Sequence, residues 1–549
     1  MARSVLDLLD DVCSLGDADV RFLPTGESYT PSDIGLSAYS AARWLQGLSD
    51  DGGAIGVILV SSFDALAVAY GAWLAGLTLV SLPHPARGVV PDEYLSSIEH
   101  MCEMAGANLL VIDRAYESLL PREPRIPLFH FDDYRGSAMT KSPREGGGFL
   151  QFTSGSSFDP KGVLISLDAL SVAISGCVEV MEPREEEIGV SWLPLSHDMG
   201  FVGVALAALC SSAPPWNTRG SLTLISPEAF LLDPGIWLRT LSDMHATFTA
   251  APGFALSLAS RLLRSMGSAL DFSSLRVLSL GAEPIRKDVL YRFSEAARPH
   301  GFDELAFNPG YGLAEATLGV SSLRPSEIWK VESFVDPGLT SSGNDSSSDG
   351  MAGAFSIEAV CCGRPFPGTS VRIVGASRDG EVGEIEVLSP SAMTRYLGDH
   401  PSPFSADGWI ATGDLGALRD GEIYVIGRKD DVIVIAGRNL APEPIEAEAE
   451  KNPVVRPGLC AAVGDADGSY AVVAEARITN TAKLAEAERS IRTALAGNFG
   501  IGPKRVVFVE SGSLPKTPSG KLRRKEIARR LSFDELICLA GRKVGQGSR

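Results

Sequence analysis

Residues 54–83 read AIGVILVSSFDALAVAYGAWLAGLTLVSLP, a stretch long and apolar enough to raise the question of a membrane-spanning helix. Asp64 and two serines interrupt it. Its pieces fit better as a strand at 56–60, a helix at 63–77 and a strand at 78–82, which together form a buried βαβ crossover. The stretch therefore predicts a parallel sheet covered by helices, and we expect no membrane span.

The same alternation of strand and helix continues along the chain. Strand candidates lie at 109–113 and 276–279, and helix candidates lie at 166–178 and 288–297. Such alternation is typical of doubly wound α/β sheets with mostly parallel strands. Because ligands bind these sheets in the loops at the carboxyl ends of the strands, we expect the functional residues there.

Changes in composition divide the chain into parts. Residues 335–355 are dominated by Ser, Gly and Asp, which predicts a mobile surface loop. Short strands with turn signals follow up to Arg428, and an Ala- and Glu-rich helix is expected at 482–499. We therefore predict an α/β fold in which residues 1–427 form a large N-terminal domain of doubly wound sheets plus a small β-rich subdomain. Residues 428–549 are expected to form a smaller α+β C-terminal domain.

Composition excludes several classes of protein. The 549 residues suffice for roughly three to four domain-sized units. Hydrophobic residues make up 45% and charged residues 21%, which is usual for a globular protein and excludes a disordered or fibrous chain. A net charge of −19 disfavours a nucleic-acid partner. The eight cysteines show no metal-ligand spacing, so we expect reduced thiols, and the N-terminus lacks a secretory pattern, so the default location is cytoplasmic.

The stretch LQFTSGSSFDPKG at 150–162 is typical of a phosphate-binding loop. Small and hydroxyl residues supply backbone and side-chain donors for phosphate oxygens, and Lys161 adds a cation. These donors are Thr153, Ser154, Gly155, Ser156 and Ser157. By composition alone, an ordinary Ser/Gly turn is an equal alternative. The lysine precedes the closing glycine, so the stretch does not fit a P-loop kinase or ATPase.

Six further motifs follow this loop in order. They are SWLPLSHDMG (191–200), LGAEPI (280–285), GYGLAEATL (310–318), TGDLG (412–416), YVIGRKDD (424–431) and LPKTPSGKLRR (514–524). The seven together resemble the adenylate-forming superfamily of acyl-CoA synthetases, luciferases and nonribosomal peptide adenylation domains. HDMG, GAEP and YGLAEATL resemble its fatty acyl-AMP ligase branch. The resemblance implies activation of a carboxylic acid as its acyl-adenylate, which this branch usually passes to the phosphopantetheine thiol of a carrier protein instead of to free CoA.

The resemblance also implies a nucleotide site. Tyr311 would stack on adenine, and the Asp414 carboxylate would accept hydrogen bonds from the ribose hydroxyls, with Arg428 nearby. A core tyrosine and a solvated turn aspartate are the structural alternatives. The other residues expected at ATP, besides the phosphate loop with its Lys161, are Gly281, Ala282, Glu283 and Gly312.

Catalytic roles follow from the same resemblance. Glu315 would hold Mg²⁺, and His197 would lie where the acyl pocket meets the α-phosphate; an exposed glutamate and a structural histidine are the alternatives. Lys521, in the Pro/Gly-rich loop PKTPSGK, would bridge the substrate carboxylate and the α-phosphate in the transition state. The C-terminal domain would swing about a hinge at Asp430 to present and withdraw this lysine.

An acyl pocket is expected beside these residues. Its lining would include Trp192, Ser196, Asp198 and Gly253. The sequence departs from the branch here: Ser196 replaces a usual aromatic residue, Phe158 replaces a usual polar one, and TAAPGFAL at 249–256 replaces an Asn-Phe-Ala-Tyr run. We therefore expect a bulkier or cyclic carboxylic acid from lipid or natural-product biosynthesis instead of a plain long-chain fatty acid.

The sequence leaves the acceptor open. An acyl carrier protein, CoA bound by this chain and a separate thiolating enzyme are three candidates, and ATP and Mg²⁺ are implied in each case. The rival class is a non-catalytic relative that binds a nucleotide or acyl ligand. A serine hydrolase is disfavoured because the chain has no GxSxG nucleophile elbow.

Overall fold

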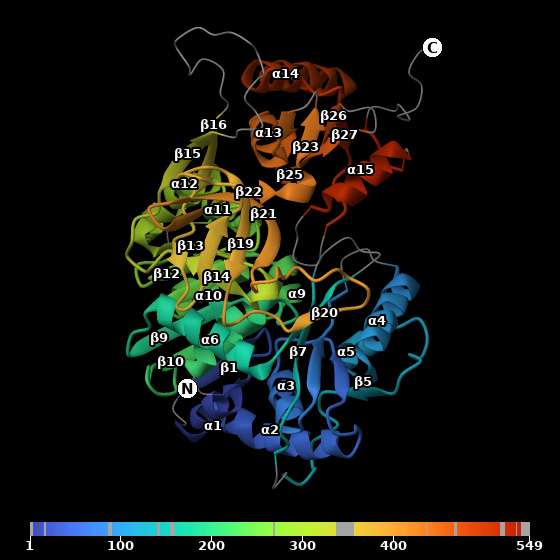
Figure 1. Cartoon of the computed structure of the whole chain (residues 1–549), viewed down its shortest axis with the longest axis vertical. Helices are drawn as coiled ribbons and strands as arrows, with labels where there is room; N and C mark the ends of the chain where they lie inside the picture. Colours follow the sequence, from blue (N-terminus) through green and yellow to red (C-terminus); the bar gives the residue numbers. More distant parts are fainter. Residues whose placement is uncertain are drawn as a thin grey trace.

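The computed structural model contains two large sheets, a small antiparallel sheet and a separate C-terminal sheet (Figure 1). The structure describes residues 4–15, 18–85, 90–139, 143–153, 160–266, 270–335, 356–435, 438–465, 469–516, 522–533 and 535–539. Most of the 335–355 segment lies outside these ranges. Among the residues in them, no helix is long and apolar enough to cross a membrane.

The first large sheet has seven strands in the order β20-β8-β7-β4-β3-β5-β6. The strands are β3 (Ala54–Val57), β4 (Thr78–Ser81), β5 (Ala107–Ile112), β6 (Leu128–His130), β7 (Gly148–Phe152), β8 (Gly162–Ile165) and β20 (Arg395–Leu397). Strands β3 to β7 run parallel, and β8 and β20 pair antiparallel at one edge. The predicted βαβ crossover is confirmed as β3-α3-β4. Its helix α3 (Phe63–Leu74) is buried along almost its whole length.

Helix α3 ends three residues before the predicted end. Gly76 has a φ of +73°, a left-handed conformation that stops a helix and that glycine adopts without strain. The helices that flank this sheet and the start of the chain are α1 (Val5–Leu15), α2 (Pro31–Gln46), α4 (Pro91–Ala105) and α5 (Arg114–Glu117). Helix α2 begins with a capping box, in which Thr30 and Asp33 satisfy each other's backbone N–H groups.

The second large sheet has nine strands in the order β17-β14-β13-β12-β11-β9-β10-β1-β2. They are β1 (Asp19–Leu23), β2 (Ser28–Tyr29), β9 (Glu186–Ser191), β10 (Arg219–Ile225), β11 (Phe248–Ala251), β12 (Val277–Leu280), β13 (Phe307–Gly312), β14 (Gly319–Ser322) and β17 (Arg364–Pro365). Its six central strands are parallel. The helices that connect them include α6 (Leu167–Met181), α7 (Asp198–Gly200), α8 (Ala207–Cys210), α9 (Pro227–Leu232), α10 (Gly235–Asp243), α11 (Gly253–Leu263) and α12 (Lys287–Ala297).

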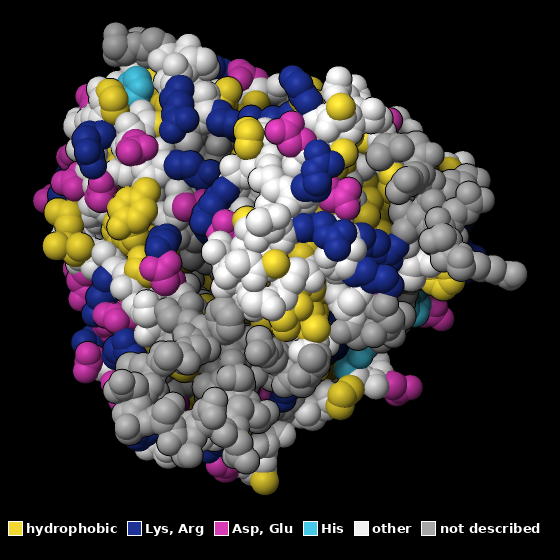
Figure 2. Space-filling model, turned by 90° about the horizontal axis from the view of Figure 1, so that it is seen from above, with side chains coloured by type: hydrophobic (Ala, Val, Ile, Leu, Met, Phe, Trp, Pro, Cys, Tyr) yellow, Lys and Arg dark blue, Asp and Glu magenta, His cyan; other side chains and the backbone are white. Residues whose placement is uncertain are grey.

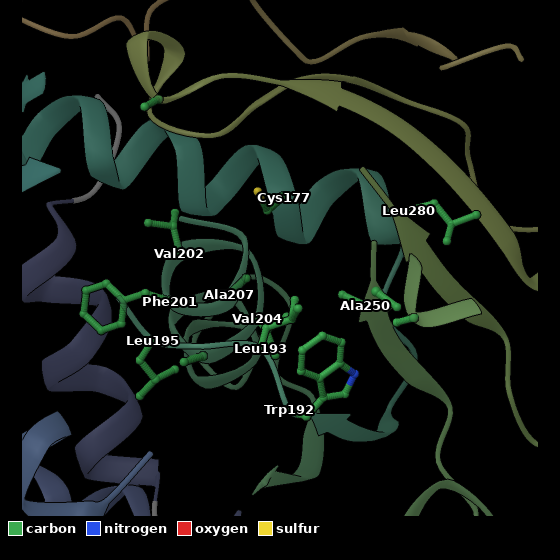
Figure 3. Close-up of a cluster of buried hydrophobic side chains, with 14 of the residues drawn as sticks. Cys177, Trp192, Leu193, Leu195, Phe201, Val202, Val204, Ala207, Ala250 and Leu280 are labelled. Carbon is green, nitrogen blue, oxygen red and sulfur yellow. The ribbon is translucent and has the colours of Figure 1, made fainter. Parts of the chain in front are cut away.

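The apolar core of this part surrounds a one-and-a-half-turn π-helix, η1 (Phe201–Leu206). Figure 3 shows its side chains between α6 and the ends of β11 and β12, with Cys177, Val204 and Ala250 facing the same interior. Phe201 is fully buried and packs against Trp73 and Phe149. All eight cysteines are free thiols.

The small antiparallel sheet has the order β18-β19-β21-β22 and matches the predicted β-rich subdomain. Its strands are β18 (Ser370–Ile373), β19 (Gly383–Leu388), β21 (Ile410–Arg419) and β22 (Glu422–Arg428). A two-stranded ribbon, β15 (Val331–Val335) with β16 (Ser356–Val360), lies beside it and contacts β22. The α/β fold class predicted for the chain is confirmed.

The C-terminal part forms one end of the molecule, drawn in orange and red in Figure 1. Its elements are β23 (Ile433–Ile435), β24 (Arg438–Leu440), α13 (Pro442–Ala449), β25 (Val455–Gly464), β26 (Tyr470–Ala476), α14 (Thr481–Phe499), β27 (Arg505–Val509) and α15 (Arg524–Ser532). Helix α15 packs with the three-stranded sheet around its own apolar cluster, which includes Ile527 and Val509. The boundary proposed between 427 and 428 falls at the end of β22.

We predict that Phe201→Ala lowers the free energy of unfolding by about 3–5 kcal/mol, because the truncation leaves a cavity among side chains that cannot close it. Leu232→Ala is the control, since Leu232 is 88% exposed and its loss should change stability by less than about 0.5 kcal/mol. Urea unfolding of both variants measures the difference. Equal midpoints for the two variants would contradict the packing described for η1.

Candidate active site

The carboxyl ends of the two large sheets lie next to each other. The Ser81 hydroxyl, at the end of β4 in the first sheet, donates a 3.3 Å hydrogen bond to the Ser196 carbonyl in the loop after β9 of the second. The phosphate-loop candidate follows β7 of the first sheet, and the Gly281 and Glu315 motifs follow β12 and β13 of the second. All the predicted motifs that are described up to Glu315 therefore face one region, as expected for doubly wound sheets.

A buried carboxylate, Asp414, joins the second sheet to the small one. The Tyr311 hydroxyl donates to Asp414 Oδ2 over 2.7 Å, and Arg428 Nε donates to Oδ1 over 2.7 Å. Residues 414 and 428 are register partners on β21 and β22. Each carboxylate oxygen keeps a second lone pair, so Asp414 can still accept hydrogen bonds from a diol. Its charge raises the pKa of Arg428, which stays cationic, and burial raises the pKa of Tyr311, which stays a donor.

The predicted adenine-bordering turn has a strained backbone. Ala282 has a φ of +70°, which is uncommon for a residue with a side chain. Glu283 Oε1 accepts a 3.0 Å hydrogen bond from the Phe254 N–H in the first turn of α11. Glu283 thus fixes the start of α11 beside the predicted acyl residue Gly253. Gly312 is required by space, because an added Cβ would lie 1.9 Å from the Leu318 carbonyl oxygen.

Lys161 and Glu315 meet through a tyrosine that the sequence analysis did not select. The Tyr396 hydroxyl donates to Glu315 Oε1 over 2.5 Å, and Lys161 Nζ lies 5.1 Å from the centre of the Tyr396 ring. The Thr153 N–H donates to the Lys161 carbonyl over 3.0 Å, which joins the two described ends of the phosphate-loop candidate. No motif marks position 396: the pairing of the three-residue strand β20 with β8 and the bonds from residues 391 and 393 to the Glu315 loop bring it here.

His197 lies with Asp198 at the start of α7. His197 Nδ1 is 2.6 Å from Asp198 Oδ1. His197 is the N-cap of this short helix: the Met199 N–H donates to His197 Nδ1 over 3.4 Å and to Asp198 Oδ1 over 2.7 Å. The imidazole is therefore oriented by its neighbour and one quarter of it is exposed.

Trp192 forms an aromatic group with three residues of the neighbouring helices. Its ring stacks on Phe230 at 3.7 Å and meets the edges of Trp237 and Phe254 at 6.5 Å and 5.9 Å. Figure 3 shows the indole beside the π-helix. Within the described part of the chain, no hydrogen-bond acceptor reaches its buried Nε1. Trp192, a predicted acyl residue, thus belongs to a buried aromatic cluster in which it is 5% exposed.

Charged pairs surround the predicted hinge. Asp430 Oδ2 lies 3.0 Å from Lys525 Nζ, which lowers the pKa of Asp430. Arg286, just after the LGAEPI motif, donates to the buried Glu450 of the C-terminal part over 2.6 Å. These contacts join α15 to the 429–431 turn and the C-terminal part to the second sheet in this arrangement.

Several predicted residues lie outside the part that the structure describes. They are Ser154, Gly155, Ser156, Ser157 and Lys521. Phe158 and residues 540–549 also lie outside the described part. Their roles stay predictions. Among the described residues there is no cluster of three or more His, Cys, Asp or Glu side chains that could hold a metal ion alone.

Comparison with known proteins adds independent findings. Residues 16–397 match the AMP-binding enzyme family. The medium-chain-fatty-acid–[acyl-carrier-protein] ligase JamA of Moorena producens is 33% identical over 68% of this chain and 66% of its own length. The long-chain-fatty-acid–AMP ligase FadD26 of Mycobacterium tuberculosis is 29% identical over 92% of each chain. A solved structure from a study of fatty acyl-adenylate ligases of E. coli and L. pneumophila has a TM-score of 0.85 at 26% identity, covering 97% of this chain and 98% of that one.

Glu443 gives a prediction on pH and stability. Its carboxylate is buried against Gly427, and burial raises its pKa from 4.5 to about 7. The folded state therefore carries a costly buried charge above pH 7 and gains a proton that relieves this cost as the pH falls toward 4.5. We expect Glu443→Gln to have a higher Tm than wild type at pH 8, with a gap that closes by about pH 5.

Glu448→Gln on the same helix is the matched control, because Glu448 pairs with the exposed Lys451. Its Tm difference from wild type should not depend on pH in this range. Thermal melts of the three proteins between pH 5 and 8 provide the measurement. A Glu443→Gln variant that is less stable than wild type at pH 8 would show that ionised Glu443 stabilises the fold through Arg524, 3.1 Å away.

Proposed function

The chain belongs to the family of AMP-binding enzymes, and on this basis we propose that it activates an apolar carboxylic acid as its acyl-adenylate and transfers the acyl group to a phosphopantetheine thiol. The observation that carries the proposal is the Tyr311–Asp414–Arg428 network, next to the group formed by Lys161, Tyr396 and Glu315. The first set suits a nucleoside and the second suits its phosphates.

The nucleoside would bind where Tyr311, Asp414 and the Gly281–Glu283 turn converge. Asp414 accepts hydrogen bonds from the ribose hydroxyls while Arg428 and Tyr311 keep its carboxylate in place. A buried acceptor that is already oriented loses little entropy when the ligand binds. A ligand without the diol would leave this acceptor less satisfied, which gives the site its preference for a ribonucleotide.

The triphosphate would bind at the Thr153–Lys161 loop. The Lys161 ammonium neutralises phosphate charge, and the Glu315 carboxylate supplies an oxygen ligand for Mg²⁺. One carboxylate fits this ion, since Mg²⁺ is usually held by one or two carboxylates together with substrate phosphates. When bound, Mg²⁺ would neutralise the leaving pyrophosphate.

In the proposed reaction a carboxylate oxygen of the acid attacks the α-phosphorus, and the bond between the α-phosphorus and the bridging oxygen of pyrophosphate breaks. Lys521 brings the two anionic groups together by binding both. His197, oriented by Asp198, lies in the loop that would border the reacting carboxylate. Withdrawal of the C-terminal domain about Asp430 then opens the mixed anhydride to a thiol.

The acid is proposed to be apolar and bulky. Trp192, Phe230 and Phe254 supply the aromatic group described above, and Ser196 places a small side chain where the family usually has an aromatic one. The two relatives are named for medium-chain and long-chain fatty acids, and this similarity supports an apolar acid as the substrate. Cyclic and linear acids of equal carbon number distinguish the two shapes in an ATP–pyrophosphate exchange assay.

We propose that the acceptor of the acyl group is a carrier protein, because the relative JamA is named as a ligase that acts on an acyl carrier protein. Figure 2, seen from the C-terminal end, shows Lys and Arg side chains interspersed with Asp and Glu on the described part of this face. CoA and a separate thiolating enzyme are the alternative acceptors. If the purified chain forms acyl-CoA from CoA, then CoA is favoured as the acceptor.

We predict that Asp414→Asn raises the KM for ATP by about 10- to 100-fold, because the variant loses its charge-assisted hydrogen bonds. Asp407→Asn is the control, since Asp407 lies in the same small sheet region and is exposed. ATP–pyrophosphate exchange measures both variants. An unchanged KM in Asp414→Asn would contradict the ribose role.

Lys521→Ala is predicted to lower the rate of acid-dependent exchange at least about 100-fold with little change in the KM for ATP, because its charge acts mainly in the transition state. Lys483→Ala, on the exposed face of α14, is the matched control. Thermal melts check that both variants fold. Full activity in Lys521→Ala would exclude the proposed catalytic lysine.

A further inference from the structure

We propose that Tyr396 is a positioning residue that sets the Glu315 carboxylate and the Lys161 ammonium for the metal-bound triphosphate. The inference rests on the proposed function, because it assigns a role within the same site. It concerns a side chain that no motif of the sequence identifies.

Tyr396 contacts both charged groups at once. Its hydroxyl donates to Glu315 Oε1 over 2.5 Å, and its ring faces the Lys161 ammonium 5.1 Å from the ring centre. An ammonium over an aromatic face is attracted by the negative face of the ring. The tyrosine therefore lies between an anion and a cation and holds each through a different part of its side chain.

The backbone around Tyr396 fixes this arrangement from two sides. In β20, Tyr396 is the register partner of Val163 on β8, two residues after Lys161. Just before β20, the Met393 N–H donates to the Glu315 carbonyl over 2.8 Å. The Ser391 hydroxyl donates to the Ala316 carbonyl over 3.1 Å.

One more bond closes the connection: the Thr317 hydroxyl donates to the Ser391 carbonyl over 2.6 Å. The segment from 391 to 397 is thus bonded to the loop after β13 in the second sheet and to β8 in the first. It is a short bridge between the strand that follows the lysine and the turn that carries the glutamate. Tyr396 is the side chain at the centre of that bridge.

The hydrogen bond from Tyr396 also gives the two oxygens of the Glu315 carboxylate different roles. Oε1 accepts the tyrosine hydroxyl, whereas no described residue donates a hydrogen bond to Oε2. A metal ion can then use Oε2 from a carboxylate whose rotation is blocked. Because Mg²⁺ demands near-ideal octahedral geometry, a fixed ligand improves its binding, and partners of metal ligands often act in this way.

The test measures metal binding without turnover. Mn²⁺ replaces Mg²⁺ as a paramagnetic probe, and its binding is titrated by electron paramagnetic resonance with α,β-methylene-ATP present. The variants are Tyr396→Phe, which keeps the ring and loses the hydroxyl, Tyr396→His, which keeps a ring donor, Glu315→Gln, and the Tyr396→Phe/Glu315→Gln double variant. Tyr134→Phe is the matched control, because the Tyr134 hydroxyl donates to another carboxylate, Asp64, over 2.8 Å.

We expect Tyr396→Phe to raise the Kd for Mn²⁺ about ten-fold, and Tyr396→His to restore part of the loss. Tyr134→Phe should leave the Kd unchanged. In the Glu315→Gln background the further effect of Tyr396→Phe should be about two-fold or less, because the hydroxyl acts through the carboxylate. In exchange assays, excess Mg²⁺ should restore most of the Tyr396→Phe rate, a recovery that a purely structural defect would not show.

A folded Tyr396→Phe protein that binds Mn²⁺ as tightly as wild type would overturn the proposal. The proposal would also be overturned if Tyr396→Phe weakened Mn²⁺ binding by the same factor in the wild-type and Glu315→Gln backgrounds. If Tyr396→Phe does not fold, the Kd for Mn²⁺ of Tyr396→His is compared with that of Tyr134→Phe instead, and the same outcomes apply. Failure of the proposed function is a separate result: Mn²⁺ and nucleotide would bind as expected, yet no acid would give pyrophosphate exchange.

Discussion

The site depends on the relative position of two sheets whose carboxyl ends lie side by side. One sheet leads into the predicted phosphate loop and Lys161, and the other carries the glycine turn, Tyr311 and Glu315. The segment from 391 to 397 pairs with a strand of the first sheet and bonds to the loop of the second. If this segment shifted, the cation and the carboxylate would separate, and the triphosphate in the proposed site could not reach both.

The proposed nucleoside site also depends on contacts between two sheets. Asp414 lies on the small sheet, yet its carboxylate is held by Tyr311 from the large second sheet. The buried charge is balanced by Arg428 on the next strand, which limits its desolvation cost. The small sheet therefore contributes the carboxylate that we propose as the acceptor for the ribose. The C-terminal part joins this assembly through Arg286–Glu450 and the pairs at Asp430.

The fold could be predicted largely from the sequence because its signals are local. The 54–83 stretch specifies strand, helix and strand by its own apolar pattern, and the motifs identify the chain as an adenylate-forming enzyme. Helix α3 ends early because of Gly76, whose left-handed backbone was not taken into account. The nucleoside residues Tyr311, Asp414 and Arg428 do come together, but the bonds between them depend on strand register.

Tyr396 could not be predicted in the same way. It lies on a three-residue strand whose partner is far away in the sequence, and such a short strand has no periodicity of its own. The capping bond from Phe254 to Glu283 has the same origin. Both depend on tertiary contacts between loops.

The central claim is that this site forms an acyl-adenylate, and mass spectrometry of the purified chain tests it most directly. The chain is incubated with ATP, Mg²⁺ and a panel of linear, aromatic and polycyclic acids without any thiol. The account predicts an acyl-AMP mass for at least one apolar acid together with an equal amount of pyrophosphate. ATP binding with no acyl-AMP and no pyrophosphate from any acid would contradict it.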